Sequence, residues 1–273
     1  MHVVPEKSSK LILLCPPNAD IPGHFKNVVS NTERHQQLLR DVQRLRGNAY
    51  LADGAVQTYD LSHDGRHRQR MDAASWHMIG MDADGTPHSC LRYWQHDNTV
   101  SFRDLALSTS AIARSPEWGF KTRAAVEQDL QLARALNIPY VELGGWAIAP
   151  EIRGTSEVLR IALATYAVWR MLGGAVGIGT VTLRHQSASI VKRLGGKPLS
   201  LNGERLPVYE DAQYGCEMEL LRFTLQDVSP RFTAWVDELE EYLQRVPVIL
   251  PSTVRAAGAG GRAAQEAFSV AKG

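Results

Sequence analysis

The sequence has little cysteine, no marked excess of charge of either sign and no long apolar run. Its 273 residues include three widely spaced cysteines, Cys15, Cys90 and Cys216. This number and spacing argue against a disulfide framework and against a CxxC metal site. Lysine and arginine total 30 against 29 acidic residues, so overall charge gives no reason to expect a nucleic-acid partner.

The apolar run LILLC at 11–15 is too short for a membrane span or a signal peptide. We therefore expect a cytoplasmic protein without an integral membrane segment. We also expect no metal site, because His77, His88 and His96 lack metal-ligand spacing with one another or with a cysteine.

Prolines, glycines and composition divide the chain into three parts. Residues 1–30 contain Pro16-Pro17 and Pro22-Gly23, which favour an arm without regular structure. Residues 31–250 carry the periodic apolar patterns of one domain, including a C-terminal amphipathic helix capped at Ser229. Residues 251–273 are rich in alanine and glycine, and we expect them to be disordered.

Within the domain, apolar periodicity predicts alternating helices and strands. Helical spacing occurs over 31–50, 120–137, 156–172, 184–196 and 230–246. Strand patterns occur on both sides of the turn DADGT and over 140–148, 175–183 and 215–225. This order predicts an α/β fold with a mixed sheet, antiparallel at first and with a parallel crossover in the middle.

The stretch VELGGWAIAPEIRGTS contains two features that point to a ligand. Gly144 and Gly145 interrupt a strand, as at a β-bulge or a close approach of another chain. A bulge would splay this strand from the next parallel one and leave backbone groups to pair with the amides of a pantetheine arm. Gly154 opens a helix, where free backbone N–H groups suit a phosphate.

These residues resemble the GNAT superfamily of N-acyltransferases. The resemblance rests on YVELGGWAIAP, EIRGTS, AVGIGTVTL and RHQSASIVKRLGGKPL. The upstream pattern is similar to acyl-homoserine-lactone synthases and N-acyl amino acid synthases, whose acidic and arginine positions would here be Asp64, Asp72, Arg92 and Glu142. The resemblance implies a mostly antiparallel sheet with a splayed parallel strand pair, flanked by helices.

The resemblance also implies roles for particular residues. Glu142 would be the general base, with backbone amides from Gly144 to Trp146 holding the oxyanion. The donor, a phosphopantetheine thioester on acyl carrier protein or coenzyme A, would contact Ala147, Ile148, Arg153, Gly154, Thr155 and Ser156. The amine substrate, expected to be an amino acid, would contact Asp72, Arg92 and His185.

Structural alternatives stand beside each of these roles. Glu142 and Asp72 also suit ion pairs with arginines, and Thr155 or Ser156 suits an ordinary helix cap. The acidic Glu151 at the first position of the glycine turn favours a carrier protein over coenzyme A. Basic residues of the first helix and loop, such as Arg40, Arg44, Arg46 and Arg66, would receive an acidic carrier protein or lie on a solvated face.

Two other functions remain open from the sequence. One is acetyl-CoA-dependent acetylation of a small amine, and the other is acyl-thioester binding without catalysis. The second is kept because the tyrosine that many GNAT enzymes use as general acid has no counterpart near Val191. The C-terminal helix is compatible with a core or homodimer contact, and its acidic polar face argues against binding to an anionic membrane.

Overall fold

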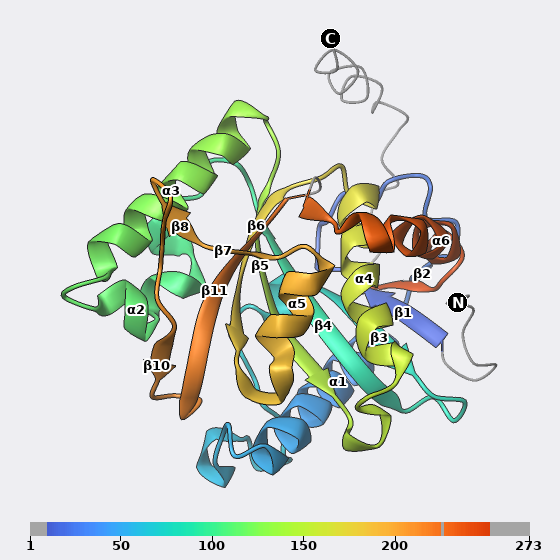
Figure 1. Ribbon diagram of the computed structural model, residues 1–273. Coiled ribbons are helices and arrows are strands. Elements are labelled where there is room, and N and C mark those ends of the chain that lie inside the picture. The colour runs from blue at the N-terminus through green and yellow to red at the C-terminus, as the bar shows by residue number, and fades with distance from the viewer. Residues whose placement is uncertain (1–9, 225–226, 252–273) are drawn as a thin grey trace.

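The computed structural model describes residues 10–224 and 227–251, which form one layered α/β fold (Figure 1). Its helices are α1 (Thr32–Ala52), α2 (Ala111–Arg114), α3 (Gly119–Ala135), α4 (Ser156–Met171), α5 (Ser187–Leu194) and α6 (Thr233–Leu243). Its strands are β1 (Lys10–Leu14), β2 (Val28–Ser30), β3 (Trp76–Met81), β4 (Pro87–His96), β5 (Tyr140–Ile148), β6 (Val176–Thr182), β7 (Lys197–Pro198), β8 (Ser200–Leu201), β9 (Glu204–Arg205), β10 (Tyr209–Asp211), β11 (Cys216–Thr224) and β12 (Val248–Leu250). The expected tail, 251–273, lies outside the described residues apart from Pro251.

The main sheet has the strand order β10-β11-β6-β5-β4-β3-β1-β12-β2, and β7 also pairs with β11. Pairing from β1 through β3 and β4 to β5 is antiparallel, as is pairing of β6 with β11 and β11 with β10. The β5–β6 pair is parallel. The expected sheet, mostly antiparallel with one parallel pair in the middle, is confirmed, and two further parallel pairs join β12 to β1 and β2.

The first 30 residues are in part a structural element of the domain. The strand β1 lies between β3 and β12, with its leucines 11, 13 and 14 nearly inaccessible to solvent. The prolines that suggested an arm lie after this strand, so they shape its connection to β2 and do not prevent it from forming. The interpretation of 1–30 as a separate arm is therefore wrong for Lys10–Leu14.

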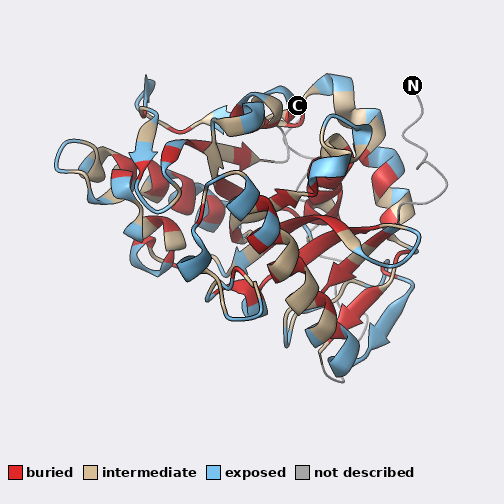
Figure 2. Cartoon of the chain, turned by 90° about the horizontal axis from the view of Figure 1, so that it is seen from below, coloured by how far each residue is buried: buried red, intermediate tan, exposed pale blue. Residues whose placement is uncertain are grey.

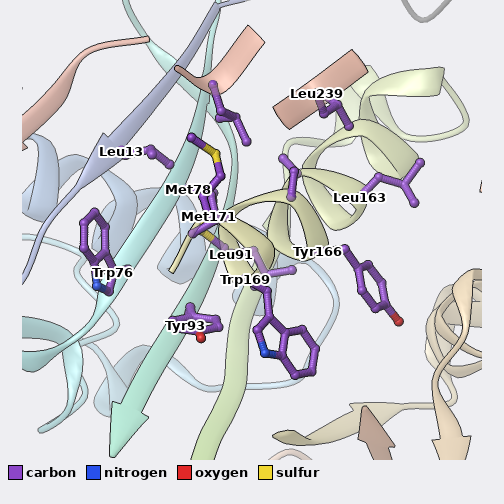
Figure 3. Packing of buried hydrophobic residues seen from close by; sticks show 14 of the residues in the cluster. Leu13, Trp76, Met78, Leu91, Tyr93, Leu163, Tyr166, Trp169, Met171 and Leu239 are labelled. Carbon is purple, nitrogen blue, oxygen red and sulfur yellow. The ribbon is translucent and has the colours of Figure 1, made fainter. Parts of the chain in front are cut away.

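Side-chain alternation along the strands produces two apolar faces. On one face, α4 and α6 pack against residues of β1, β3, β4 and β5; Trp169 of α4 lies there with Trp76 of β3 and Tyr93 of β4 (Figure 3). On the other face, α1 packs against β1, β3 and β4, and α3 packs against β5, β6 and β11. Figure 2 shows the buried residues concentrated in the strands and on the inner sides of the helices.

Helix ends largely follow the sequence signals. Asn31 caps α1, because its side chain accepts a hydrogen bond from the Arg34 amide at 2.8 Å. Thr155 caps α4 by accepting from the Glu157 amide. Ser229 makes no side-chain capping bond; a short 3-10 turn, Pro230–Phe232, precedes α6 instead. Among the described residues, none of the helices is long and apolar enough to cross a membrane.

Candidate active site

The two glycines in β5 form a bulge, as the sequence predicts. Cys90 of β4 lies opposite Ala147, and Arg92 lies opposite Gly144, so the register shifts between them. Gly145 has φ +61°, a conformation that side chains with a Cβ rarely adopt. The bulge therefore bends β5 at the position where the parallel pairing with β6 stops.

The parallel strands β5 and β6 separate beyond the bulge. Their pairing runs from Tyr140 opposite Val176 to Leu143 opposite Gly179, and the described residues show no further register pairs between them. A cavity of about 980 Å³ occupies the gap and takes wall residues from both strands and from both faces of the sheet. The predicted cleft between the splayed strands is present.

One part of the cavity wall is apolar. It belongs to the face covered by α4 and α5 and contains Leu143, Trp146, Ile148, Ala162, Tyr166, Trp169, Val181, Ile190, Val191, Leu194 and Phe223. Tyr166 and Trp169 are almost fully buried and stack with ring centroids 5.9 Å apart. Such a wall suits a hydrocarbon chain, because apolar surface gains free energy when it leaves water.

The opposite part of the wall is polar and aromatic. It contains Tyr50, Gln69, Arg70, Trp94, Ser110, Arg114, Glu142, Tyr209, Asp211 and Tyr214. Glu142 points to this side because its neighbours Val141 and Leu143 pack on the α4 face. The cavity therefore joins an apolar chamber to a polar one through the gap in the sheet.

The carboxylate of Glu142 lies at the junction and is firmly held. The Ala106 amide donates to Oε1 at 2.9 Å and the Leu107 amide donates to Oε2 at 3.0 Å. His96 Nε2 lies 3.1 Å from Oε1, and the His96 ring is 4.1 Å from the Trp94 ring centroid. A carboxylate has about four lone-pair sites, so these three contacts leave one site on Oε2 for a substrate proton.

Asp72 and Arg92 meet, but Asp72 lies below the cavity wall. Arg92 Nη1 donates to Asp72 Oδ1 at 2.9 Å, and Arg46 binds both carboxylate oxygens at 2.8 and 2.5 Å. The Asp72 side chain is 3% exposed and is absent from the cavity wall, whereas Arg92 contributes to that wall. That Arg92 contacts the substrate therefore stays a prediction. Asp72 would have an indirect role, because it fixes the position of the Arg92 side chain.

Arg46 was not expected in the interior. Its side chain is 1% exposed, and it donates to the His67 carbonyl as well as to Asp72. The interpretation of Arg46 as part of a solvated basic face is therefore wrong. Its position on the stripe of His35, Leu38, Val42 and Ala49, at helical spacing, was the available signal.

Charge balance governs this buried cluster. Burial alone would raise the pKa of Asp72, but hydrogen bonds and charge from Arg46 and Arg92 outweigh it and hold the pKa well below its usual range. Burial, together with the charge of Arg46, lowers the pKa of the neighbouring His67 to about 4. Asp72 therefore stays ionised and His67 stays neutral at neutral pH.

The glycine turn before α4 is present, and its arginine already has a partner. Gly154 has φ +84° and lies in the cavity wall with Arg153. Arg153 donates to both carboxylate oxygens of Asp53 at 2.7 and 3.0 Å. Thr155 and Ser156 are exposed and do not belong to the cavity wall.

The remaining predicted residues also have clear positions. Trp146, Ala147 and Ile148 line the cavity along the part of β5 that no longer pairs with β6. His185 lines it from the turn after β6, with Nε2 3.2 Å from Asp53 Oδ1. The described residues contain no cluster of three or more His, Cys, Asp or Glu side chains placed to hold a metal ion.

Comparison with solved structures supports the fold. A CoA-dependent acyl-homoserine lactone synthase, BjaI, with SAM and isopentyl-CoA superposes with a TM-score of 0.53 at 10% identity, covering 91% of this chain and 96% of that one. The same enzyme with MTA gives 0.50 at 12% identity, with coverage of 91% and 96%. FeeM, an N-acyl amino acid synthase from uncultured soil microbes, gives 0.45 at 11% identity, with coverage of 80% and 92%.

The two BjaI comparisons show that this chain has the fold of an acyl-homoserine lactone synthase structure, which confirms the GNAT-like fold indicated by the sequence motifs. At these identities the likeness concerns the fold alone. Neither the family models nor the curated proteins yield a match to the sequence.

Proposed function

We propose that the protein is an N-acyltransferase that moves a fatty acyl group from a phosphopantetheine thioester to a primary amine. The observation that carries the proposal is the cavity between β5 and β6. It joins an apolar chamber, suited to an acyl chain, to a polar chamber that contains the Glu142 carboxylate. One acceptor position of this carboxylate has no hydrogen-bond donor from the described residues. The bulge lies between the two chambers, where the thioester carbon would sit.

The cavity volume favours a long acyl chain. Its value of about 980 Å³ is at the upper end of the usual range for small-molecule sites, which is about 300–1,000 Å³. An acetyl group would leave most of the apolar wall uncovered. We therefore prefer a fatty acyl donor to acetyl-CoA as the substrate of this site.

The polar chamber favours an acceptor that carries a carboxylate. Arg70 and Arg114 both line it, and neither forms an ion pair with a described residue. Arg70 lies over the Trp94 ring, with its guanidinium carbon 5.9 Å from the centroid. An amino acid would offer its carboxylate to these cations and its amine to Glu142, which supports an amino acid as the acceptor.

The reaction follows from these positions. Glu142 takes a proton from the amine, whose lone pair attacks the thioester carbon and forms the new C–N bond. Backbone amides between Gly144 and Trp146 hold the oxyanion of the tetrahedral intermediate. The intermediate then collapses as the C–S bond breaks, and the sulfur leaves with the electron pair. The thiolate takes up the proton that Glu142 received from the amine, so that the amide and the free thiol are the products and Glu142 is again a carboxylate.

His96 would assist Glu142 without touching the substrate. Its Nε2 faces Glu142 Oε1, while its ring packs on Trp94 away from the cavity wall. A histidine that donates to Oε1 fixes the orientation of the Glu142 carboxylate. Its loss should therefore lower the acyl-transfer rate, whereas donor affinity should not change.

Mass spectrometry of the reaction products tests the proposal. The protein is incubated with long-chain acyl carrier protein or acyl-CoA and a pool of amino acids and amines, beside Glu142→Gln and the exposed control Glu217→Gln. We expect an N-acyl product that falls by about 100-fold or more in Glu142→Gln and is unchanged in Glu217→Gln. Tight donor binding without product would instead show a non-catalytic acyl-thioester-binding protein. A product formed from acetyl-CoA alone would favour the acetyltransferase.

A further inference from the structure

The carboxylate of Asp53 contacts residues of two turns, one after β5 and one after β6. It is the C-cap residue of α1, and its side chain is 16% exposed. Arg153, after β5, binds both carboxylate oxygens, and His185, after β6, lies 3.2 Å from Oδ1. Arg184 Nη1 donates to the Asp53 main-chain carbonyl at 2.7 Å. All four residues line the cavity where β5 and β6 diverge.

This arrangement places a negative charge where the donor phosphate is expected. The guanidinium fork of arginine binds carboxylate and phosphate in the same two-pronged way. Asp53 therefore occupies the Arg153 contacts that a phosphate beside Gly154 would use. A second carboxylate, Glu151, is exposed in the same turn. An incoming phosphate must compete with Asp53 for Arg153, and the Asp53 carboxylate weakens the attraction of each further negative charge on the donor to the arginines of this site.

We propose that Asp53 selects the acyl donor by its charge. By holding Arg153, it makes the site favour a pantetheine arm that carries the single charge of a phosphodiester, as on a carrier protein. It disfavours coenzyme A, which carries a diphosphate and a further phosphate on its ribose. The inference rests on the proposed function, because it assumes that the cavity binds a pantetheine thioester.

Binding measurements that do not need the amine acceptor test this role. Calorimetry is carried out with S-decyl thioethers of coenzyme A, of phosphopantetheine methyl phosphodiester and of pantetheine, which cannot be transferred. Asp53→Asn is compared with wild type and with Asp84→Asn, an exposed carboxylate outside the cavity wall. We expect Asp53→Asn to tighten the coenzyme A ligand by about tenfold and the phosphodiester by less, with pantetheine unchanged. Asp84→Asn should change none of the three.

A second variant covers the case in which Asp53→Asn does not fold. Arg153→Gln leaves Asp53 without its arginine, so the two phosphorylated ligands should bind several-fold more weakly while pantetheine binds as in wild type. The proposal is overturned if Asp53→Asn weakens the phosphorylated ligands, because Asp53 would then position Arg153 for phosphate. It is also overturned if the ratio of the three affinities does not change. If the pantetheine ligand does not bind to the wild-type protein, both the proposed acyltransferase function and the proposed role of Asp53 are wrong.

Discussion

The guanidinium of Arg46 lies directly against the backbone of Gly145. A Cβ atom at this glycine would stand 2.9 Å from Arg46 Nη1 and 3.3 Å from the Arg92 Cβ atom. The buried ion cluster and the bulge are therefore one unit. Asp72 holds Arg46, Arg46 fills the space beside Gly145, and the bulge opens the strand pair to form the cavity.

Gly145→Ala should destabilise the fold for two reasons. Alanine must adopt φ +61°, and its methyl group collides with the Arg46 guanidinium. We expect a loss of about 2–5 kcal/mol in the free energy of unfolding, measured with urea. Gly154→Ala is the matched control, since Gly154 has φ +84° but open space around its Cβ position. It should lose about 1–2 kcal/mol. Equal losses would show that the Arg46 contact is easily relieved.

Asp72→Asn should leave two buried arginines without their shared charge. Removing one partner of a buried ion pair costs about 3–5 kcal/mol, and we expect a loss of this size at neutral pH. Asp84→Asn, on the exposed turn between β3 and β4, is the control and should change little. A loss no larger than that of the control would mean that Arg46 and Arg92 find other partners.

The same carboxylate should make stability depend on acid pH. Because the pKa of Asp72 lies below its unfolded value of about 3.9, its contribution is fully present above that value. It is lost as the pH falls through the folded pKa, where the native carboxylate takes up its proton. Wild type should therefore lose stability below about pH 4 more steeply than Asp72→Asn. Parallel pH curves for the two proteins would contradict this assignment.

Asp129 should behave in the opposite way. Burial raises its pKa to about 6, even though Arg222 Nη2 lies 2.7 Å from Oδ1 and lowers it. The native state then holds a proton that the unfolded chain has already lost, so stability falls as the pH rises from about 4 to about 6. A carbon-detected NMR titration of the carboxyl group should show a midpoint near 6. A midpoint near 4 would mean that Arg222 outweighs burial.

Ala162→Phe should shorten the acyl chains that the cavity accepts. Ala162 is 7% exposed and belongs to the apolar wall on α4. A phenyl ring there would fill space along the chain's path, so kcat/KM for a dodecanoyl donor should fall by about tenfold relative to a butanoyl donor. Ala212→Phe is the control, because Ala212 belongs to the wall between β10 and β11. An unchanged ratio of kcat/KM for the two donors would mean that the acyl chain binds in another part of the cavity.

Local patterns predicted the elements that have strong local signals. The amphipathic helices, the hairpin at Asp82–Gly85 and the bulged strand were all predicted near their observed positions. Strands β2 and β12 were missed because each has three residues and depends on distant partners. An apolar periodicity can be recognised only over a longer segment than three residues. The pairing of β12 with β1 and β2 could therefore not be predicted from the local sequence pattern.

The part of the cavity wall that was predicted from the sequence comes from one short stretch of the chain. Glu142, the two glycines and the Gly154 turn lie within 15 residues of one another, and the structure places Glu142 and both glycine motifs in one cavity wall. Asp53 was missed because it binds Arg153 from 100 residues away. An aspartate at a helix end is common, and its partner is decided by how α1 packs across the sheet.

The position of β12 affects how this chain folds during synthesis. Leu13 pairs with Val248, and β2 joins the sheet through β12. Strands β1 and β2 therefore cannot complete their pairing until β12, which follows them by more than half of the sequence, has also been synthesised. Until β12 has been synthesised, the edge of β1 opposite β3 is unpaired and can pair with a strand of another chain. The delay between synthesis of β1 and synthesis of β12 is therefore a period in which the chain is exposed to mispairing.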